Sequence, residues 1–336
     1  MFNHQSEGSM KSQFVASIAA VVLLIFCSSC YTHEPDETGL LVPQTVDEDP
    51  TLPSIFVNGT QLHAETFGNP NDPMIVVLHG GPGKDYRSIL NCSRFSADSF
   101  FVVFYDQRGC GLSKRHEKDI FTTELFINDL DAVIKYYRQR PDQKIILMGK
   151  SWGAMLATAY VNEHPTEISG VVLIEPGAFT WHDTEEYIKK ERTLEYFGET
   201  SNDFVYVDQI ITGSSHNILD YKAAVQNAAD FSKGNRVGNS GPYPFWRFGA
   251  VCASAAFEYV KKHPFDFTTH LQQYTTKVLF VYSELNQTYG IEHARFVSSA
   301  YPNVQLAEIK GSGHEVPYFG WDNYYPVAKA YLNSIK

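Results

Sequence analysis

The sequence predicts an α/β fold in which a mostly parallel β-sheet carries helices on both faces. Beyond residue 53, short runs rich in β-branched and aromatic residues alternate with helical patterns. Several of these runs are apolar throughout, as strands are when both faces of a parallel sheet are covered. The chain has 336 residues, 43% of them apolar, and is long enough to bury a large core. Disordered, collagen-like and coiled-coil architectures are therefore excluded.

Eight segments have the length and composition of strands. In chain order they are SIFVNGTQ, QLHAETFG, MIVVLHG, FFVVFYDQR, KIILMG, GVVLIEP, KVLFVYSEL and VQLAEIK. The helical pattern ELFINDLDAVIKYYRQR follows the fourth segment, and a second helix begins at Trp152 after the fifth. This alternation predicts an eight-stranded, mostly parallel sheet with helices on both faces.

A helical insertion interrupts the strand pattern. Between residues 179 and 270 the sequence becomes polar, helical and aromatic, and the strand pattern resumes at KVLFVYSEL. The core therefore needs its last two strands from beyond the insertion. We expect one α/β core formed by residues 53–178 and 271–336, with a helical insertion at 179–270 that acts as a lid.

An export signal is predicted at the N-terminus. Residues 14–26 form an apolar run that is too short for a membrane span but typical of the apolar region of a signal peptide. The run leads into CSSC at 27–30, which resembles a bacterial lipobox, although Cys27 stands where leucine is usual. We expect a lipoprotein signal peptide at 1–29 and a mature chain that begins at a lipidated Cys30. An uncleaved N-terminal anchor is the alternative, and either places the protein in a bacterial cell envelope, periplasmic or surface-exposed.

The segment that follows, residues 30–52, is predicted to be an acidic, solvated tether. It carries six carboxylates and prolines at 35, 43 and 50, but no Lys or Arg. Over the whole chain, 38 Asp and Glu against 27 Lys and Arg give a net charge of -11. Because nucleic-acid binding needs a basic surface, no nucleic-acid partner is expected. Membrane contact is expected only through the N-terminal lipid anchor.

The five cysteines do not form a metal-binding pattern. None belongs to a repeated Cys-x-x-Cys pair or lies near histidines at ligand spacing. We therefore expect no metal site and no required disulfide, and the chemistry must come from other residues.

The clearest chemical motif is Gly149-Lys150-Ser151-Trp152-Gly153, which follows a strand and opens a helix. This G-x-S-x-G pattern is the nucleophile elbow of α/β hydrolases, in which small residues permit a tight turn that lifts a serine hydroxyl above the sheet. A glycine-rich helix start is the alternative interpretation. The position between strand and helix favours Ser151 as a nucleophile.

Two further loops complete the predicted site. The loop HGGPG at 79–83 closes the third strand, and its glycines let backbone N–H groups approach a substrate carbonyl. We expect the N–H groups of Gly81 and Trp152 to form an oxyanion hole, with a simple tight turn as the alternative. His314 lies in a glycine-flanked loop after the last strand and is the expected general base and acid. A surface histidine is the alternative there.

Three motifs together carry a family resemblance: HGGPG, DQRGCGLS at 106–113, and G-x-S-W-G. With them the sequence resembles the proline iminopeptidase family of α/β hydrolases over nearly all of residues 54–336, apart from the insertion. The resemblance implies a serine hydrolase that releases N-terminal residues from short peptides through an acyl-enzyme, without a metal or an organic cofactor.

The catalytic acid departs from the pattern of that family. By resemblance it follows the strand VLFVYS, where this chain has Asn286 instead of an aspartate. Asparagine can orient an imidazole but cannot balance the charge of an imidazolium. Glu175 offers a carboxylate at the end of GVVLIEP, the preceding core strand, and is our first choice. Asn286 is the second choice, and Glu284 is the third.

Two other functions stay open on the sequence. A carboxylic ester hydrolase uses the same machinery, so the expected substrate is a small peptide or an ester. The departure at Asn286 also allows a non-catalytic binding lipoprotein that has kept the fold.

Overall fold

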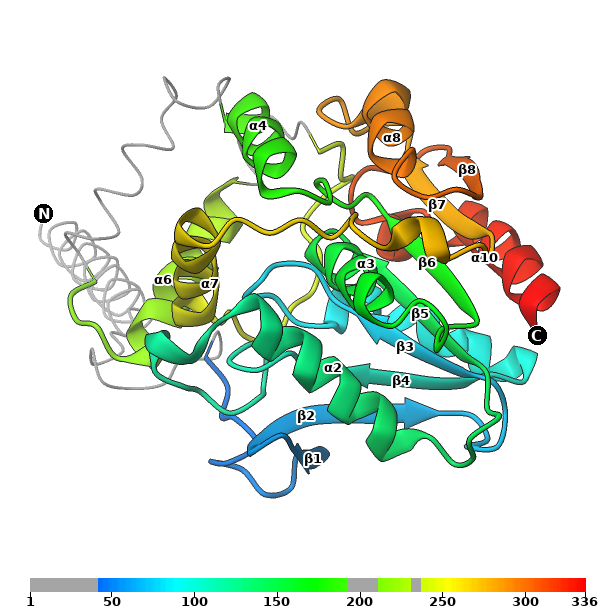
Figure 1. Ribbon diagram of the computed structural model, residues 1–336. Coiled ribbons are helices and arrows are strands. Elements are labelled where there is room, and N and C mark those ends of the chain that lie inside the picture. The colour runs from blue at the N-terminus through cyan, green and yellow to red at the C-terminus, as the bar shows by residue number, and fades with distance from the viewer. Residues whose placement is uncertain (1–41, 193–210, 231–236) are drawn as a thin grey trace, which may run out of the picture. The chain divides into compact units, whose positions relative to one another are not determined.

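The centre of the molecule is an eight-stranded β-sheet, shown in the computed structural model of Figure 1. The structure describes residues 42–192, 211–230 and 237–336. The strands are β1 (Ser54–Val57), β2 (Thr60–Phe67), β3 (Met74–Leu78), β4 (Phe101–Tyr105), β5 (Ile145–Lys150), β6 (Gly170–Ile174), β7 (Val278–Ser283) and β8 (Val304–Ile309). Their order in the sheet is β1-β2-β4-β3-β5-β6-β7-β8, and every pair from β4 to β8 is parallel, whereas β2 is antiparallel to both of its neighbours. The predicted eight-stranded, mostly parallel sheet is confirmed.

Helices cover both faces of this sheet. They are η1 (Arg87–Asp98), η2 (Lys118–Ile120), α2 (Thr123–Tyr137), α3 (Trp152–Glu163), α4 (Trp181–Arg192), α6 (His216–Asp230), α7 (Ala250–Lys262), η3 (Leu271–Gln273), α8 (Gly290–Ser298), α9 (Val316–Phe319) and α10 (Trp321–Ile335). Alternate side chains of a strand point to opposite faces. In β3, Met74, Val76 and Leu78 accordingly join the apolar cluster that includes α2 and α3, and Ile75 and Val77 join the cluster that includes η1 and α10.

The insertion between β6 and β7 is helical in its described part, where it forms α4, α6 and α7. Its two ends lie side by side, because the Trp181 N–H donates to the Phe265 carbonyl at 2.9 Å and the Phe267 N–H donates to the Phe179 carbonyl at 2.9 Å. Helices α6 and α7 also lie side by side, at the left of Figure 1. The insertion therefore leaves the core and returns to it at one place.

The predicted tether is wrong for residues 42–46, which pack against the core, whereas residues 47–52 are mostly exposed. The side chains of Val42 and Val46 are each only 2% exposed. The Val46 N–H donates to the Leu112 carbonyl at 2.9 Å, and a guanidinium nitrogen of Arg247 donates to the Pro43 carbonyl at 2.8 Å. Two buried valines and backbone hydrogen bonds to the core outweigh the acidic composition that suggested a solvated segment.

The N-terminal predictions concern residues whose structure is not described. The signal peptide at 1–29 and the lipidation site Cys30 lie outside the described residues. Within the described ranges, no helix combines the length and apolar character needed to cross a bilayer. The lipid anchor stays a prediction.

Candidate active site

Ser151 lies at a sharp turn between β5 and α3, as the elbow motif predicts. Its φ of 54° and ψ of -123° place it in a region that residues other than glycine rarely adopt. A Cβ atom on Gly149 would lie 2.3 Å from the Gly153 carbonyl oxygen, and one on Gly153 would lie 2.2 Å from the carbonyl oxygen of Leu78. Gly149 therefore permits the tight turn from β5 into α3, and Gly153 permits α3 to lie close to the end of β3.

His314 and Glu175 form a hydrogen-bonded pair beside this turn. The Nδ1 atom of His314 lies 2.7 Å from Oε2 of Glu175, which follows β6 directly. The carboxylate is fully buried, whereas the imidazole side chain is 18% exposed. The predicted contact between Glu175 and His314 is therefore present in the structure.

Three more donors hold the Glu175 carboxylate. The Ser283 N–H and hydroxyl donate to Oε1 at 2.7 and 2.5 Å, and the Asn286 side-chain amide donates to Oε2 at 2.8 Å. Burial acts to raise the pKa of Glu175, but His314 and these hydrogen bonds together lower it below its ordinary value. The carboxylate is consequently ionised at neutral pH and fixes the tautomer of His314, with the proton on Nδ1.

The two other candidates for the acid have different contacts. Asn286 orients the Glu175 carboxylate instead of the imidazole, so the second choice for the acid is a support of the first. Glu284 accepts hydrogen bonds from the Lys310 ammonium at 3.1 Å and from the Gly311 N–H at 2.9 Å, at the surface of the next loop. Glu284 is therefore occupied by local contacts of its own.

The HGGPG loop lies against Ser151. A Cβ atom on Gly80 would lie 3.3 Å from the Ser151 Cβ. Gly81 has a φ of +130°, a backbone conformation that would be strained for any residue with a side chain. Trp152 occupies the first position of α3, where a backbone N–H has no acceptor within the helix. Its indole N–H donates to the Gln107 side chain at 2.8 Å, which fixes the start of the helix. Gly81 and Trp152 both line the same cavity as Ser151.

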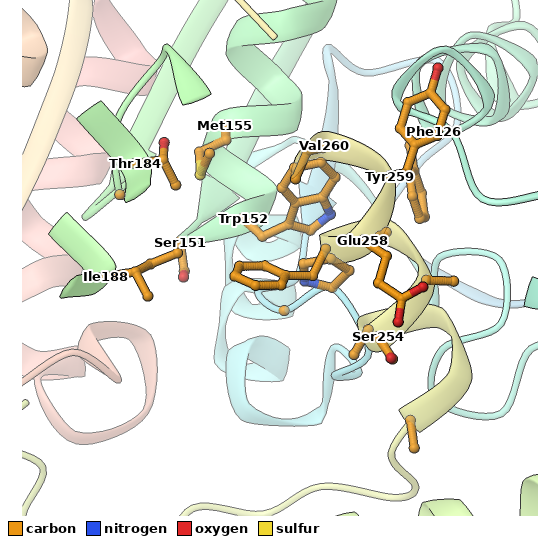
Figure 2. A pocket seen from close by; sticks show the side chains of 18 of the residues that line it. Phe126, Ser151, Trp152, Met155, Thr184, Ile188, Ser254, Glu258, Tyr259 and Val260 are labelled. Atoms are coloured by element: carbon orange, nitrogen blue, oxygen red, sulfur yellow. The ribbon is translucent and has the colours of Figure 1, made fainter. Parts of the chain in front are cut away.

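This cavity has a volume of about 1060 Å³, and Ser151, Glu175 and His314 all line it. Figure 2 shows Ser151, together with Ile188 of helix α4, on one side of the cavity. Ser254 and Glu258 of helix α7 lie on the other side. The helices of the insertion thus form much of its wall. The apolar lining residues include Phe126, Trp152, Met155, Trp181, Ile188, Phe257, Val260 and Phe265.

A buried ion pair joins the serine turn to the histidine loop, and sequence reasoning missed it. Lys150 precedes Ser151, Glu315 follows His314, and the ammonium of the first contacts the carboxylate of the second, with side-chain exposures of 3% and 1%. Burial acts to raise the pKa of Glu315, but the charges of Lys150, Lys84 and His314 together lower it to about 2. The Glu315 carboxylate is therefore ionised at neutral pH.

The insertion also braces the histidine loop. The His314 N–H donates to the Val237 carbonyl at 2.8 Å, and the Glu315 N–H donates to the Asn239 side chain at 2.8 Å. In residues 42–192, 211–230 and 237–336, no group of three or more His, Cys, Asp or Glu side chains is placed to hold a metal ion. Ser151, His314 and Glu175 present a hydroxyl, an imidazole and a carboxylate to the cavity.

The fold and the arrangement of these loops define the class of protein. The sequence matches the model of the α/β hydrolase fold family over residues 73–320. The chain therefore belongs to the α/β hydrolase fold family.

Its similar proteins include proline iminopeptidases, which confirms the resemblance seen in the sequence. One from Thermoplasma volcanium is 35% identical over 99 residues, which cover 30% of this chain and 33% of that protein. Another, PfmaB of Pestalotiopsis fici, is 24% identical over 279 residues, which cover 78% of this chain and 92% of that protein. A solved thermophilic esterase from Thermogutta terrifontis superposes with a TM-score of 0.58 at 18% identity, over 84% of this chain and 98% of that chain. At that identity the likeness concerns the fold alone.

Proposed function

We propose that this hydrolase is a serine peptidase of the proline iminopeptidase type, which releases N-terminal residues from short peptides through an acyl-enzyme. The observation that carries the proposal is the hydrogen bond of 2.7 Å between His314 and Glu175 on the wall of the cavity that also exposes Ser151. The three residues follow one another in the chain as the nucleophile Ser151, the acid Glu175 and the base His314, which is the order found in α/β hydrolases.

In the first half of the proposed reaction, the Ser151 hydroxyl oxygen attacks the carbonyl carbon of the scissile amide. The Nε2 atom of His314 takes the hydroxyl proton, and the ionised Glu175 stabilises the resulting imidazolium. The negative charge on the former carbonyl oxygen is met by the N–H groups of Gly81 and Trp152. Each preorganised donor of this kind is worth roughly 3 to 4 kcal/mol at the transition state.

The second half releases both products. His314 gives its proton to the departing amine, and the C–N bond breaks to leave an ester on Ser151. Water then attacks this ester with His314 as the base, the ester bond breaks, and the Ser151 hydroxyl re-forms. Besides substrate and water, these steps use Ser151, His314, Glu175 and the two backbone N–H groups.

An ester hydrolase is the second candidate, because the cavity wall around Ser151 is mostly apolar and the same three residues cleave esters. Three substrates separate the candidates: a prolyl arylamide with a free amine, the same compound with an acetylated amine, and a small aryl ester. The peptidase proposal expects the first to be cleaved and the second to be spared. Cleavage of the ester alone favours the second candidate.

Labelling by a fluorophosphonate probe tests the shared chemistry. Wild-type protein should be labelled on Ser151, and Ser151→Ala should not be labelled. If the folded wild type stays unlabelled, the protein is better explained as a non-catalytic binding lipoprotein.

We further propose that the protein is a lipoprotein of a bacterial cell envelope, anchored through Cys30. The support is the apolar run at 14–26 followed by Ser-Ser-Cys. Cys30→Ser should release the protein from the membrane fraction or leave its precursor uncleaved. Mass spectrometry that finds an unmodified Cys30 inside a mature peptide contradicts this proposal.

A further inference from the structure

Two cysteines from distant parts of the chain meet at the base of the insertion. The Sγ atoms of Cys110, in the loop after β4, and Cys252, in the first turn of α7, lie 3.4 Å apart, although the residues are 142 positions apart in sequence. Their side chains are 0% and 1% exposed. The third cysteine of the described residues, Cys92 on η1, belongs to the apolar cluster on the other face of the sheet.

The backbones that carry this pair are already in contact. A Cβ atom on Gly249 would lie 2.0 Å from the Gly109 carbonyl oxygen, and one on Gly109 would lie 3.2 Å from the Cys252 Cβ. The Arg115 guanidinium ties the same segments together, because it donates to the carbonyls of Gly111 at 2.7 Å and Phe248 at 3.0 Å. Glycine contacts and hydrogen bonds between the two chain segments therefore hold the two sulfur atoms opposite each other.

A disulfide bond needs the two sulfur atoms about 2.05 Å apart. From the present 3.4 Å, the two sulfur atoms have to approach each other by roughly 1.4 Å in total, that is by less than about 1 Å each. Rotation of the two side chains supplies this movement. We propose that Cys110 and Cys252 are a modification site, at which an external disulfide oxidises the two thiols to a bond between the core and helix α7. The expectation from the sequence, that no disulfide is required, stays a prediction.

The reaction balances with a small disulfide such as oxidised glutathione as the oxidant. One cysteine thiolate attacks the glutathione disulfide, forms a mixed disulfide and releases one glutathione thiolate. The second cysteine thiolate then attacks the protein sulfur of that mixed disulfide and releases the other glutathione. The protein loses two electrons and two protons, and glutathione disulfide gains them as two thiols.

The timing of this reaction follows from burial. Both side chains are closed to solvent in the folded protein, which keeps an external disulfide away from them, and burial also raises the pKa of the Cys252 thiol well above its ordinary value. Oxidation should therefore take place while the chain folds, before helix α7 has packed onto the core.

The bond would fix one wall of the cavity. Helix α7 supplies Ala253, Ser254 and Phe257 to the cavity lining, next to Cys252 in sequence. On the other side of the bond, Gln107 contacts the indole of Trp152 at the start of α3. Oxidation would thus join the helix of the insertion to the loop that supports the serine turn.

The test is to refold the full chain in two buffers, one with oxidised and one with reduced glutathione, and to map the peptides by mass spectrometry without reduction. The oxidised sample should contain one peptide pair that joins Cys110 to Cys252 and has lost two hydrogens. Its Tm should be higher than that of the reduced sample by roughly 5 to 10 °C, because the bond closes a long loop. Hydrogen exchange in the first turn of α7 should be slower in the oxidised sample.

Two variants complete the experiment. Cys252→Ala should abolish the difference in Tm between the two buffers, and the matched control Cys92→Ala should retain it. The wild-type peptide map decides the question even if Cys252→Ala fails to fold. Alkylation of both thiols after oxidative refolding overturns the proposal, as does a link from either cysteine to Cys92, to the N-terminal cysteines or to glutathione.

Discussion

Two histidine–carboxylate pairs of nearly the same length lie in this molecule, in different surroundings. His314 Nδ1 lies 2.7 Å from Glu175, and His63 Nδ1 lies 2.8 Å from Asp106. Both carboxylates are fully buried. The His314 side chain, however, is 18% exposed and lines the cavity, whereas the His63 side chain is 3% exposed inside the protein.

The second ring nitrogen explains the difference between the pairs. Nε2 of His63 lies 3.3 Å from the Tyr86 hydroxyl, and the imidazole stacks on the Tyr86 ring. Asp106 also accepts from the Tyr86 N–H at 3.1 Å, so this pair is enclosed and joins strand β2 to two loops. His314 shares its cavity with Ser151 instead. A short imidazole–carboxylate contact can serve catalysis only where a nucleophile and a substrate reach the second nitrogen.

Removal of the nucleophile should have the largest effect. Ser151→Ala should lower kcat by a factor of about 10⁴ or more, because the elbow then carries no hydroxyl to attack the substrate. The matched control is Ser299→Ala at the exposed end of α8, which should keep full activity. Both are measured as kcat of purified protein, with circular dichroism to verify the fold. More than a trace of turnover by Ser151→Ala contradicts its role.

The acid of the exposed pair should have the next largest effect. Glu175→Gln should lower kcat by about 10⁴-fold, or roughly 5 kcal/mol, because the imidazolium loses its counter-charge. Asn286→Ala removes one hydrogen bond to that carboxylate and should cost about tenfold. Asp106→Asn, in the enclosed pair, should leave kcat of the folded protein within about threefold. Equal losses for Glu175→Gln and Asn286→Ala would show that our choice of acid is wrong.

The ion pair of Lys150 and Glu315 should affect both stability and rate. Lys150→Met leaves a buried carboxylate without its partner and should lower the free energy of unfolding by about 3 to 5 kcal/mol. The double variant Lys150→Met/Glu315→Leu removes both charges and should recover most of that loss in urea unfolding.

The rate of the double variant separates two roles for this pair. If the pair also positions Ser151 and His314, kcat should stay low by about tenfold despite the recovered stability. Full recovery of kcat in the double variant would assign the pair to stability alone, like the pair of His63 and Asp106.

The residues that sequence reasoning could find are those with a local signature. Ser151 stands in a glycine motif between strand and helix, and the central strands consist mainly of apolar runs, MIVVL in β3 and IILM in β5, so their pattern needs no tertiary information. Glu175 was the first choice because the ends of adjacent parallel strands meet at one edge of a sheet. That rule places a residue near the site without knowledge of its partners.

The features that sequence reasoning missed depend on contacts between distant segments of the chain. Lys150 and Glu315 are 165 positions apart, and neither has a pattern that names the other. Val42 and Val46 looked like part of a tether because their burial depends on the surface they pack against. The aromatic wall of the cavity was missed for a similar reason, since spacing on α7 does not reveal which face turns toward Ser151.

The smallest expected effect is on the pH dependence of stability, where the two pairs should differ in sign. The pKa of Glu175 is lowered, against the effect of burial, by His314, Ser283 and Asn286. These contacts therefore stabilise the folded protein at pH values above 4.5, the ordinary pKa of a glutamate. This stabilisation is lost as the pH falls through the lower pKa that Glu175 has in the folded state. This pair should weaken only in acid.

The enclosed pair should weaken in base. Burial acts to lower the pKa of His63, but the Asp106 charge and hydrogen bond, with the charges of Glu65 and Asp85, raise it above 6.5. Its stability is fully present below 6.5 and is lost as the pH rises through the folded-state pKa. Burial and the Asp106 charge also raise the pKa of Asp85 to about 7. The raised pKa of Asp85 likewise lowers the stability of the folded protein as the pH rises, at somewhat lower pH than His63 does.

The Tm of the wild type should therefore fall as the pH rises from about 6 to about 9. Asp106→Asn removes the charge that raises the pKa of both His63 and Asp85, so its Tm should be lower near pH 6 but should change less with rising pH. Glu175→Gln is the matched control, because it should keep the alkaline slope of the wild type and lose part of the acid one. Calorimetry of the three proteins measures these slopes. An alkaline slope in Asp106→Asn as steep as that of the wild type would mean that the enclosed pair does not control it.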